Sequence, residues 1–182
     1  MPFLGRALAS RSRLVMLKLM SFVAVGAVAL AAQPTAAQAA MGPDAASCRA
    51  GSSEPAFLVN VNGFKSRTGR VRVQIYDQSN FLVKGKRVRR LDLPVVASAM
   101  PICIALPGPG SYAVAVRHDV NGNNKSGDWN DGGGFSRNPK ISLMDLKPSF
   151  NEVAVSAGNG VKPLNVILNY RQGFQIKPVS RS

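Results

Sequence analysis

The sequence has few acidic residues, a single histidine and almost no glutamate. Its 182 residues include 23 Lys and Arg but only 9 Asp and Glu, which gives a formal net charge of +14. The only glutamates are Glu54 and Glu152. Catalysis by paired glutamates, zinc sites with closely spaced His or Cys ligands, and glycine-rich phosphate loops all have recognisable spacings. None of these spacings occurs, so these common classes of enzyme are excluded.

The chain also lacks a long apolar run. Its most apolar segment, residues 19–32, spans 14 residues, whereas a membrane-spanning helix needs about 20. Basic residues precede this segment and the small-residue site Ala37-Gln38-Ala39 follows it, an order typical of a secretory signal peptide. We therefore expect residues 1–39 to be cleaved after Ala39 or Ala40. The protein is then exported, periplasmic or secreted, with no transmembrane segment after cleavage; the alternative is an uncleaved membrane anchor.

Cysteine is scarce, with only Cys48 and Cys103 in the chain. Export would place both where disulfides persist, and an even count fits one bridge between them. In the chain-entropy description, closing a loop of this length stabilises a fold by about 4 kcal/mol. The alternative interpretation is two buried thiols.

Amphipathic helices are not evident after residue 40, whereas apolar and polar residues often alternate. Val71, Val73 and Ile75 alternate with polar residues over 70–76, which predicts a strand with one buried face. Such runs predict about seven strands, near residues 56–64, 69–77, 86–96, 101–107, 111–119, 150–157 and 164–170. The pattern indicates an all-β fold, an antiparallel sandwich, with a small barrel as the alternative.

Several local features refine this prediction. Turn residues between the first two strands favour a hairpin, and Pro94 places the third strand at a sheet edge. Residues 140–147 are expected to form one helical turn. The domain organisation is a loose leader over 40–55, the sandwich over 56–170, and a fraying basic tail over 171–182.

Basic residues are concentrated in one short segment, with five cations in the seven residues 84–90: Lys84, Lys86, Arg87, Arg89 and Arg90. Such a cluster can bind anionic surfaces, and for an exported protein we expect an anionic envelope lipid or polysaccharide. Nucleic acid is not expected, because no nucleic-acid-binding motif is present. The alternative interpretation is an edge strand that Lys and Arg protect against aggregation.

The segment 117–136 holds the only His and the only Trp of the chain. Asp119, Asn121 and Asn123 occupy positions one, three and five of a calcium-loop pattern, and position twelve carries Asn130 in place of the usual Glu. Asp128 or Asp131 would have to complete the site, whose dissociation constant would be about 10⁻⁴ to 10⁻³ M. The alternative is a turn in which Asp and Asn side chains bond their own backbone.

The same segment raises two further hypotheses. A hydrolase would use His118 with Asp119 and Ser136, but adjacent strand residues face opposite ways and Ser136 lacks a nucleophile elbow. An architectural loop would fold Trp129 and Phe135 over the end of the sandwich, with residues 132–134 allowing a tight turn.

Three pieces of the sequence resemble a known family: LPGPGSYAVAVRHDVNGN at 106–123, GGGFSRNP at 132–139 and PLNVILNY at 163–170. They are similar to an exported bacterial family catalogued as domain of unknown function 2141. The resemblance implies an immunoglobulin-like or transthyretin-like sandwich and no established activity. The loop departs from the family pattern at Asn124, where members tend to have Gly, and in a shortened linker at 130–133.

The sequence therefore predicts an exported, non-enzymatic β-sandwich that acts as a cell-envelope binding or structural module without a cofactor. A weak calcium-binding, adhesion-type domain that uses the 119–131 loop is the second hypothesis. A hydrolase that uses His118 is the third.

Overall fold

The computed structural model of the protein describes residues 39–125 and 127–179. The expected signal peptide lies outside these residues except for Ala39. Neither helical segment in the described part has the length and hydrophobicity to span a bilayer. The elements are η1 (Ala45–Cys48), β1 (Ala56–Asn62), β2 (Arg70–Tyr76), β3 (Arg89–Pro94), β4 (Ala99–Ala105), β5 (Gly110–Asp119), β6 (Gly132–Phe135), α1 (Phe150–Val153), β7 (Ala154–Ala157), β8 (Val161–Ile167), β9 (Asn169–Gln172) and β10 (Gln175–Pro178).

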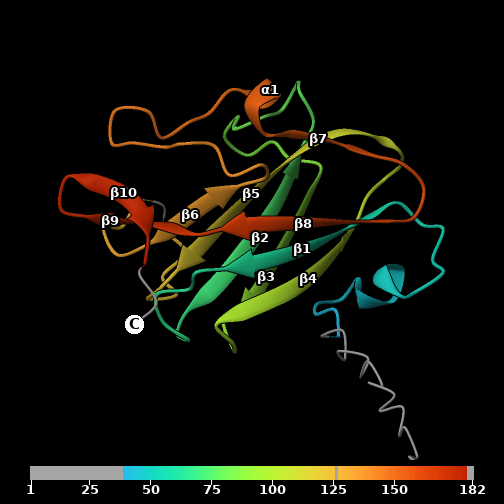
Figure 1. Cartoon of the computed structure of the whole chain (residues 1–182), viewed down its shortest axis with the longest axis horizontal. Helices are drawn as coiled ribbons and strands as arrows, with labels where there is room; N and C mark the ends of the chain where they lie inside the picture. The colour runs from blue at the N-terminus through green and yellow to red at the C-terminus, as the bar shows by residue number, and fades with distance from the viewer. Residues whose placement is uncertain (1–38, 126, 180–182) are drawn as a thin grey trace, which may run out of the picture. The chain divides into compact units, whose positions relative to one another are not determined.

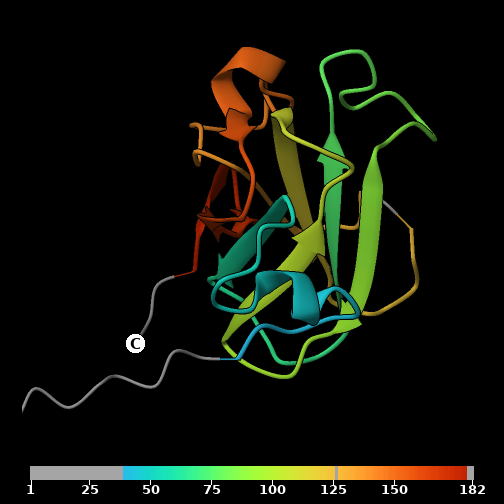
Figure 2. The same ribbon diagram turned by 90° about the vertical axis from the view of Figure 1, so that its right-hand side faces the viewer.

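The strands form two sheets that pack on each other (Figures 1 and 2). The smaller sheet has the order β4-β1-β8, and the larger has the order β10-β9-β6-β5-β2-β3, with β7 also pairing with β5. This arrangement confirms the predicted all-β sandwich. It has ten strands against about seven expected, and β1 pairs with β8 in parallel, so the smaller sheet is mixed.

The core lies between the two sheets and comes from alternating strand positions. Val71, Val73 and Ile75 are fully buried, as the alternation predicts, and they face the buried side chains of β1. Burial of this apolar surface is the main contribution to the stability of the sandwich. The β1 residues of this core are Phe57, Val59 and Val61.

Two predictions of strand pairing are wrong. β1 and β2 do not form a hairpin: β1 pairs with β4 and β8, whereas β2 pairs with β3 and β5. The segment 164–170 is not one strand, because the chain passes from β8 in the smaller sheet to β9 in the larger one. At the crossing, the Leu168 N–H donates to the Asn62 carbonyl over 2.9 Å. Leu164, Val166, Leu168 and Tyr170 are buried, whereas Asn165 and Ile167 are exposed, so the segment keeps one buried face through the crossing.

Two predictions about helical structure are also wrong. Residues 150–157 begin with the helical turn α1 and only then become strand β7. The Glu152 carboxylate accepts a hydrogen bond from the Ser149 N–H over 2.7 Å, and this capping box favours a helix start over a strand. Residues 140–147, expected to form a helical turn, form no helix.

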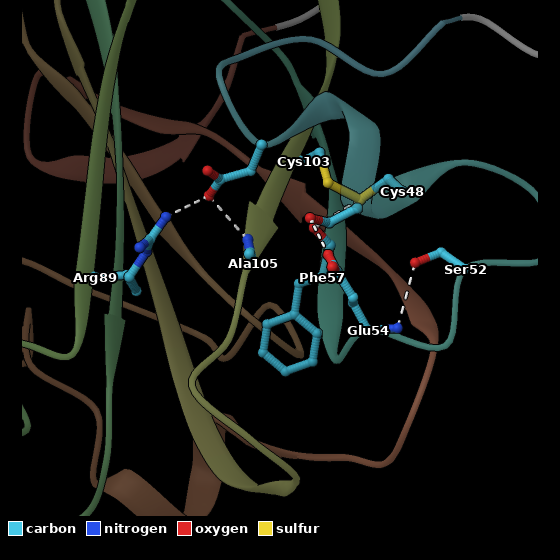
Figure 3. Close-up of a disulfide and its surroundings, with 9 residues drawn as sticks. Cys48, Ser52, Glu54, Phe57, Arg89, Cys103 and Ala105 are labelled. Carbon is cyan, nitrogen blue, oxygen red and sulfur yellow. Dashed lines mark hydrogen bonds and ion pairs between the residues drawn. A yellow bond between two sulfur atoms is a disulfide. The ribbon is translucent and has the colours of Figure 1, made fainter.

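The stretch 40–55, expected to be a loose leader, is held against the smaller sheet. The predicted disulfide joins Cys48 to Cys103 on β4 (Figure 3). Met41 adds two backbone hydrogen bonds to β4, from its N–H to Pro101 (2.7 Å) and from the Cys103 N–H to its carbonyl (3.0 Å). Asp44 pairs with Arg89 over 2.6 Å.

The two edges of the larger sheet differ from each other. β3 forms one edge and ends in Pro94, which confirms the prediction made from the proline. β10 forms the other edge, and it pairs with β9 in a hairpin where a fraying tail was expected. The hairpin places the side chains of Arg171 and Ile176 opposite each other.

Candidate functional site

His118 lies in β5 and is fully buried. Its Nε2 is 2.8 Å from the Thr68 carbonyl, and its Nδ1 is 2.6 Å from the Tyr170 hydroxyl. A carbonyl can only accept, so Nε2 carries the proton and Nδ1 accepts from Tyr170. The Tyr170 oxygen in turn accepts from the Lys65 N–H over 3.1 Å. Both ring nitrogens are therefore engaged in structural hydrogen bonds.

Burial sets the ionisation of this pair. It lowers the pKa of His118 below its usual value of 6.5 and raises the pKa of Tyr170 to about 12. Both groups are therefore neutral at pH 7, in agreement with the hydrogen-bond directions. A neutral imidazole with no free nitrogen cannot take a proton from a substrate without breaking this network.

The other members of the hydrolase hypothesis lie elsewhere. Ser136 is buried, and its Oγ contacts the Val153 carbonyl and accepts from the Val114 N–H over 3.0 Å. Val114 and His118 are four residues apart on β5, which is about 13 Å along a strand. Asp119 follows His118 directly in the strand and faces the opposite side of the sheet. The three residues therefore do not form a nucleophile, base and orienting carboxylate.

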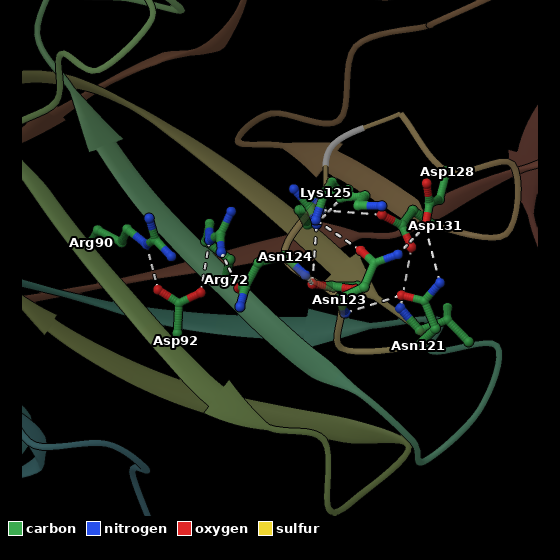
Figure 4. Close-up of polar contacts among 12 residues, drawn as sticks. Arg72, Arg90, Asp92, Asn121, Asn123, Asn124, Lys125, Asp128 and Asp131 are labelled. Atoms are coloured by element: carbon green, nitrogen blue, oxygen red, sulfur yellow. Dashed lines mark hydrogen bonds and ion pairs between the residues drawn. The ribbon is translucent and has the colours of Figure 1, made fainter.

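The Asn and Asp side chains after β5 bond to one another (Figure 4). Asn121 Oδ1 accepts from the Asn123 N–H (3.1 Å), and Asn123 Oδ1 accepts from the Lys125 N–H (2.8 Å). Asp128 Oδ2 accepts from the amides of Asn121 (3.0 Å) and Asn123 (2.7 Å). The hydrogen bonds from Asn121 and Asn123 lower the pKa of Asp128. Asn124 adopts the left-handed φ of 63° that the family's glycine would favour.

Arg117 provides a positive charge inside this loop. Its guanidinium lies 3.1 Å from Asp119 Oδ2 and 3.3 Å from Asp131 Oδ2, and it donates to the Lys125 carbonyl. These are groups that the calcium hypothesis would place around an ion. Asp119 Oδ1 and Asp131 Oδ2 are buried without a hydrogen bond, so the nearby guanidinium is their charge compensation. Across the described residues, no group of three or more His, Cys, Asp or Glu side chains is arranged to hold a metal ion.

The glycines after the loop form strand β6 and not a tight turn. A Cβ on Gly132 would lie 2.3 Å from the Tyr170 ring, and a Cβ on Gly134 would lie 2.5 Å from the Ile167 carbonyl. Gly132 and Gly134 are therefore required by close packing of β9 and β8 against β6. Phe135 does not cap the sandwich; it packs on the outer face of the larger sheet with Phe81.

Trp129 does not close the core either, because 69% of its surface is exposed. The guanidinium carbon of Arg171 lies 3.3 Å from the centre of the Trp129 ring. The two side chains belong to a cleft of about 390 Å³ on the outer face of the larger sheet. The floor comes from β2, β5, β6 and β9, and the walls come from residues 127–131, 141–146 and Ile176.

The five basic residues of 84–90 are all exposed, but they do not form one patch of free charge. Arg89 pairs with Asp44 and Arg90 pairs with Asp92, on either side of the edge strand β3. No carboxylate of the described residues lies within ion-pair distance of Lys84, Lys86 or Arg87. Their position at and beside a sheet edge agrees with a protective role.

Comparison with protein-family models matches residues 59–165 to a family described as uncharacterized protein conserved in bacteria (DUF2141). The chain belongs to the DUF2141 family. Neither the curated proteins nor the solved structures contain a match. In this DUF2141 chain the matched span includes His118, the loop and all three β6 glycines, but not Tyr170 or Arg171.

Sequence reasoning missed the residues that matter most to the cleft of this family member. Arg117 and Arg171 were not among the candidate residues, although Arg117 stands two positions before Asp119 and therefore shares its face. Arg171 lies in the segment expected to be a tail. Only the pairing of β9 with β6 brings it beside Trp129.

Proposed function

We propose that this protein is an exported, non-enzymatic module that attaches to anionic lipid surfaces of the bacterial envelope. The observation that carries the proposal is a group of exposed apolar side chains around the cleft. Met144 is 98% exposed and follows the lining residue Leu143, and Phe174 is 91% exposed in the turn between β9 and β10, the two strands that contribute Arg171 and Ile176 to the cleft. Trp129 and Leu146, themselves lining residues, are also exposed. We call these four residues the apolar rim.

The apolar rim lies on one side of the molecule. The β9–β10 hairpin and the segment leading to α1 project on the same side in Figure 1, and both contribute to the cleft. Single exposed apolar residues are ordinary, but a contiguous group of them marks an interaction site. Tryptophan and phenylalanine at such positions are favourable at a membrane interface, where the ring is buried and polar groups stay hydrated.

The charge around the rim favours an anionic partner. Lys140, Lys147, Arg171 and Lys177 lie within four positions of a rim residue in the sequence, against two acids without an ion pair, Asp128 and Asp145. No carboxylate among residues 39–125 and 127–179 pairs with any of the four cations. Cations beside inserted apolar side chains are attracted to anionic headgroups within a Debye length. A lipid fits better than a polysaccharide, because only a lipid offers a hydrocarbon interior for Met144 and Phe174.

Export and the lack of catalysis have separate support. The disulfide between Cys48 and Cys103 suits an oxidising compartment outside the cytoplasm. The structural hydrogen bonds of His118 and Ser136 leave neither residue free for acyl transfer. Both points agree with a binding module.

Cosedimentation with vesicles tests the proposed function. Wild-type protein is expected to bind vesicles that contain phosphatidylglycerol, to bind phosphatidylcholine vesicles weakly, and to dissociate as salt is raised. Phe174→Glu is expected to abolish binding. Val96→Glu, which replaces an apolar residue of 55% exposure away from the cleft, is the matched control and is expected to bind like the wild type.

Three results would contradict the proposal. One is equal binding to both vesicle types, and another is binding that survives Phe174→Glu. The third is binding to an acidic polysaccharide with no binding to either vesicle, which would replace lipid with polysaccharide as the partner.

A further inference from the structure

The cleft has the size and lining of a small-molecule site. Its volume of about 390 Å³ falls within the usual range of about 300 to 1,000 Å³ for ligand pockets. One wall is apolar and comes from Ile141, Leu143 and Ile176. The floor adds Phe135, so that one part of the cleft offers only hydrocarbon and aromatic surface to a ligand.

Arg171 places an oriented positive charge against this apolar wall. Its guanidinium stacks on Trp129, and its Nε donates to the Gly173 carbonyl over 3.2 Å. Among the described residues, no carboxylate lies within ion-pair distance of it. The two contacts fix the plane of the guanidinium and leave its terminal nitrogens available to donate to a carboxylate or phosphate.

The charge of Arg117, the other cation of the floor, is already neutralised by nearby carboxylates. Arg117 pairs with Asp119 and Asp131, and Asp131 itself lines the cleft. Asp128 lines the same wall. Among the charged lining residues, Arg117 and Arg171 balance Asp128 and Asp131, so the cleft offers an anion only the local charge of Arg171, and the nearby acids would repel a ligand with several negative charges.

We infer that the cleft binds a singly anionic amphiphile, with its carboxylate or phosphate on Arg171 and its apolar tail against Ile141, Leu143 and Ile176. This inference goes beyond attachment to a bilayer, because the ligand is a single molecule that enters the cleft from solution. Trp129 stacks on the anchoring cation and is the only tryptophan of the chain, so its fluorescence reports on the site.

The test is a titration of the full-length exported protein with monomeric decanoate, decyl methyl phosphate (a singly charged phosphodiester) and decyltrimethylammonium, each below its micelle concentration. Trp129 emission and calorimetry are the two readouts. The two anions are expected to bind and shift the emission, and the cation is expected not to bind. Arg171→Leu is expected to weaken anion binding about tenfold or more, as for the loss of a hydrogen bond to a charged group.

Two controls keep the test decisive. Arg171→Lys is expected to retain part of the affinity because it keeps the charge, and Lys162→Leu, which replaces an exposed cation on β8 of the smaller sheet, is expected to leave affinity unchanged. Melting temperatures establish that each variant is folded. Equal affinity for the decyl cation and the anions, or unchanged affinity in Arg171→Leu, would overturn the assigned ligand class.

Absence of binding by all three compounds would overturn the site itself. The vesicle experiment is independent, because Phe174 does not line the cleft. Vesicle binding without decanoate binding would refute this inference alone, and decanoate binding without vesicle binding would refute the proposed function alone.

Discussion

The Tyr170 hydroxyl lies 2.6 Å from Nδ1 of His118 and joins the last part of the domain to the strand that precedes the loop. Tyr170 and His118 belong to two of the three sequence pieces that resemble the family. In the structure they are partners in one buried hydrogen-bond network with Thr68 and Lys65. The most recognisable residues of the sequence thus hold the sandwich together at this end.

Removing the Tyr170 hydroxyl should lower the free energy of unfolding. Tyr170→Phe leaves the His118 Nδ1 and the Lys65 N–H without partners, and a buried unsatisfied group costs about 1–3 kcal/mol. The free energy of unfolding from urea denaturation measures the loss. Tyr112→Phe is the control, because its hydroxyl donates only to the Gly108 carbonyl near the surface and should cost less. A Tyr170→Phe protein as stable as the wild type would contradict the assigned network.

The buried His118 predicts a specific pH dependence. Its folded pKa lies below 6.5, so the unfolded chain takes up a proton first as pH falls. Stability from this group is complete above pH 6.5 and is lost as pH falls from 6.5 towards the folded pKa. No other histidine exists, and ordinary carboxyls titrate near pH 4; burial raises the pKa of Asp131, whose proton uptake in the folded state acts in the opposite direction, so the profile is measured in Asp131→Asn as well. The free energy of unfolding should therefore fall between pH 7 and pH 5, and a flat profile there would argue against a neutral buried His118.

Adjacent glycines of β6 should respond differently to the same substitution. Gly132→Ala places a Cβ 2.3 Å from the Tyr170 ring, whereas Gly133→Ala meets only the Val116 carbonyl at 3.7 Å. Overpacking a buried site costs about 1–3 kcal/mol, so Gly132→Ala should lower the melting temperature clearly and Gly133→Ala should change it little. Equal effects at the two positions would show that Tyr170 does not pack against β6 in this way.

Arg117 should compete with calcium for the loop. The guanidinium already compensates Asp119 and Asp131, so calcium at about 10 mM, above the weak range of about 10⁻⁴ to 10⁻³ M, should leave the wild-type melting temperature unchanged. Arg117→Ala should be less stable without calcium and should gain stability when calcium is added. Lys125→Ala is the matched control, since only its backbone N–H and carbonyl take part in the hydrogen bonds of the loop. A calcium-dependent rise in the wild type would instead support the calcium hypothesis.

The alternation of apolar and polar residues, one proline and two cysteines were enough to predict much of the fold. Val71, Val73 and Ile75 identified a strand and its buried face, Pro94 identified an edge, and two cysteines predicted one bridge. The strand and the edge follow from a local sequence pattern, and two cysteines can form only one intramolecular disulfide. The sandwich class follows from them.

The rest depends on contacts between distant segments. Nothing local in residues 164–170 marks Leu168 as the point where the chain changes sheets, because buried positions are apolar in either sheet. The glycines of β6 have no strand-like side chains, and their need for close packing arises only from Tyr170 and Ile167. The cleft brings together residues from 74 to 176, so no single stretch of sequence could have predicted it.

We propose that the protein binds its partners through the cleft and its apolar rim, and not through His118 or the loop oxygens. Trp129 emission during titration with vesicles of phosphatidylglycerol carrying brominated acyl chains is the decisive measurement. Trp129 is the sole tryptophan and lies on the rim, so we predict a shift to shorter wavelength together with quenching by the bromine atoms. Unchanged emission at vesicle concentrations where the protein cosediments would contradict the claim, because binding would then occur through another surface.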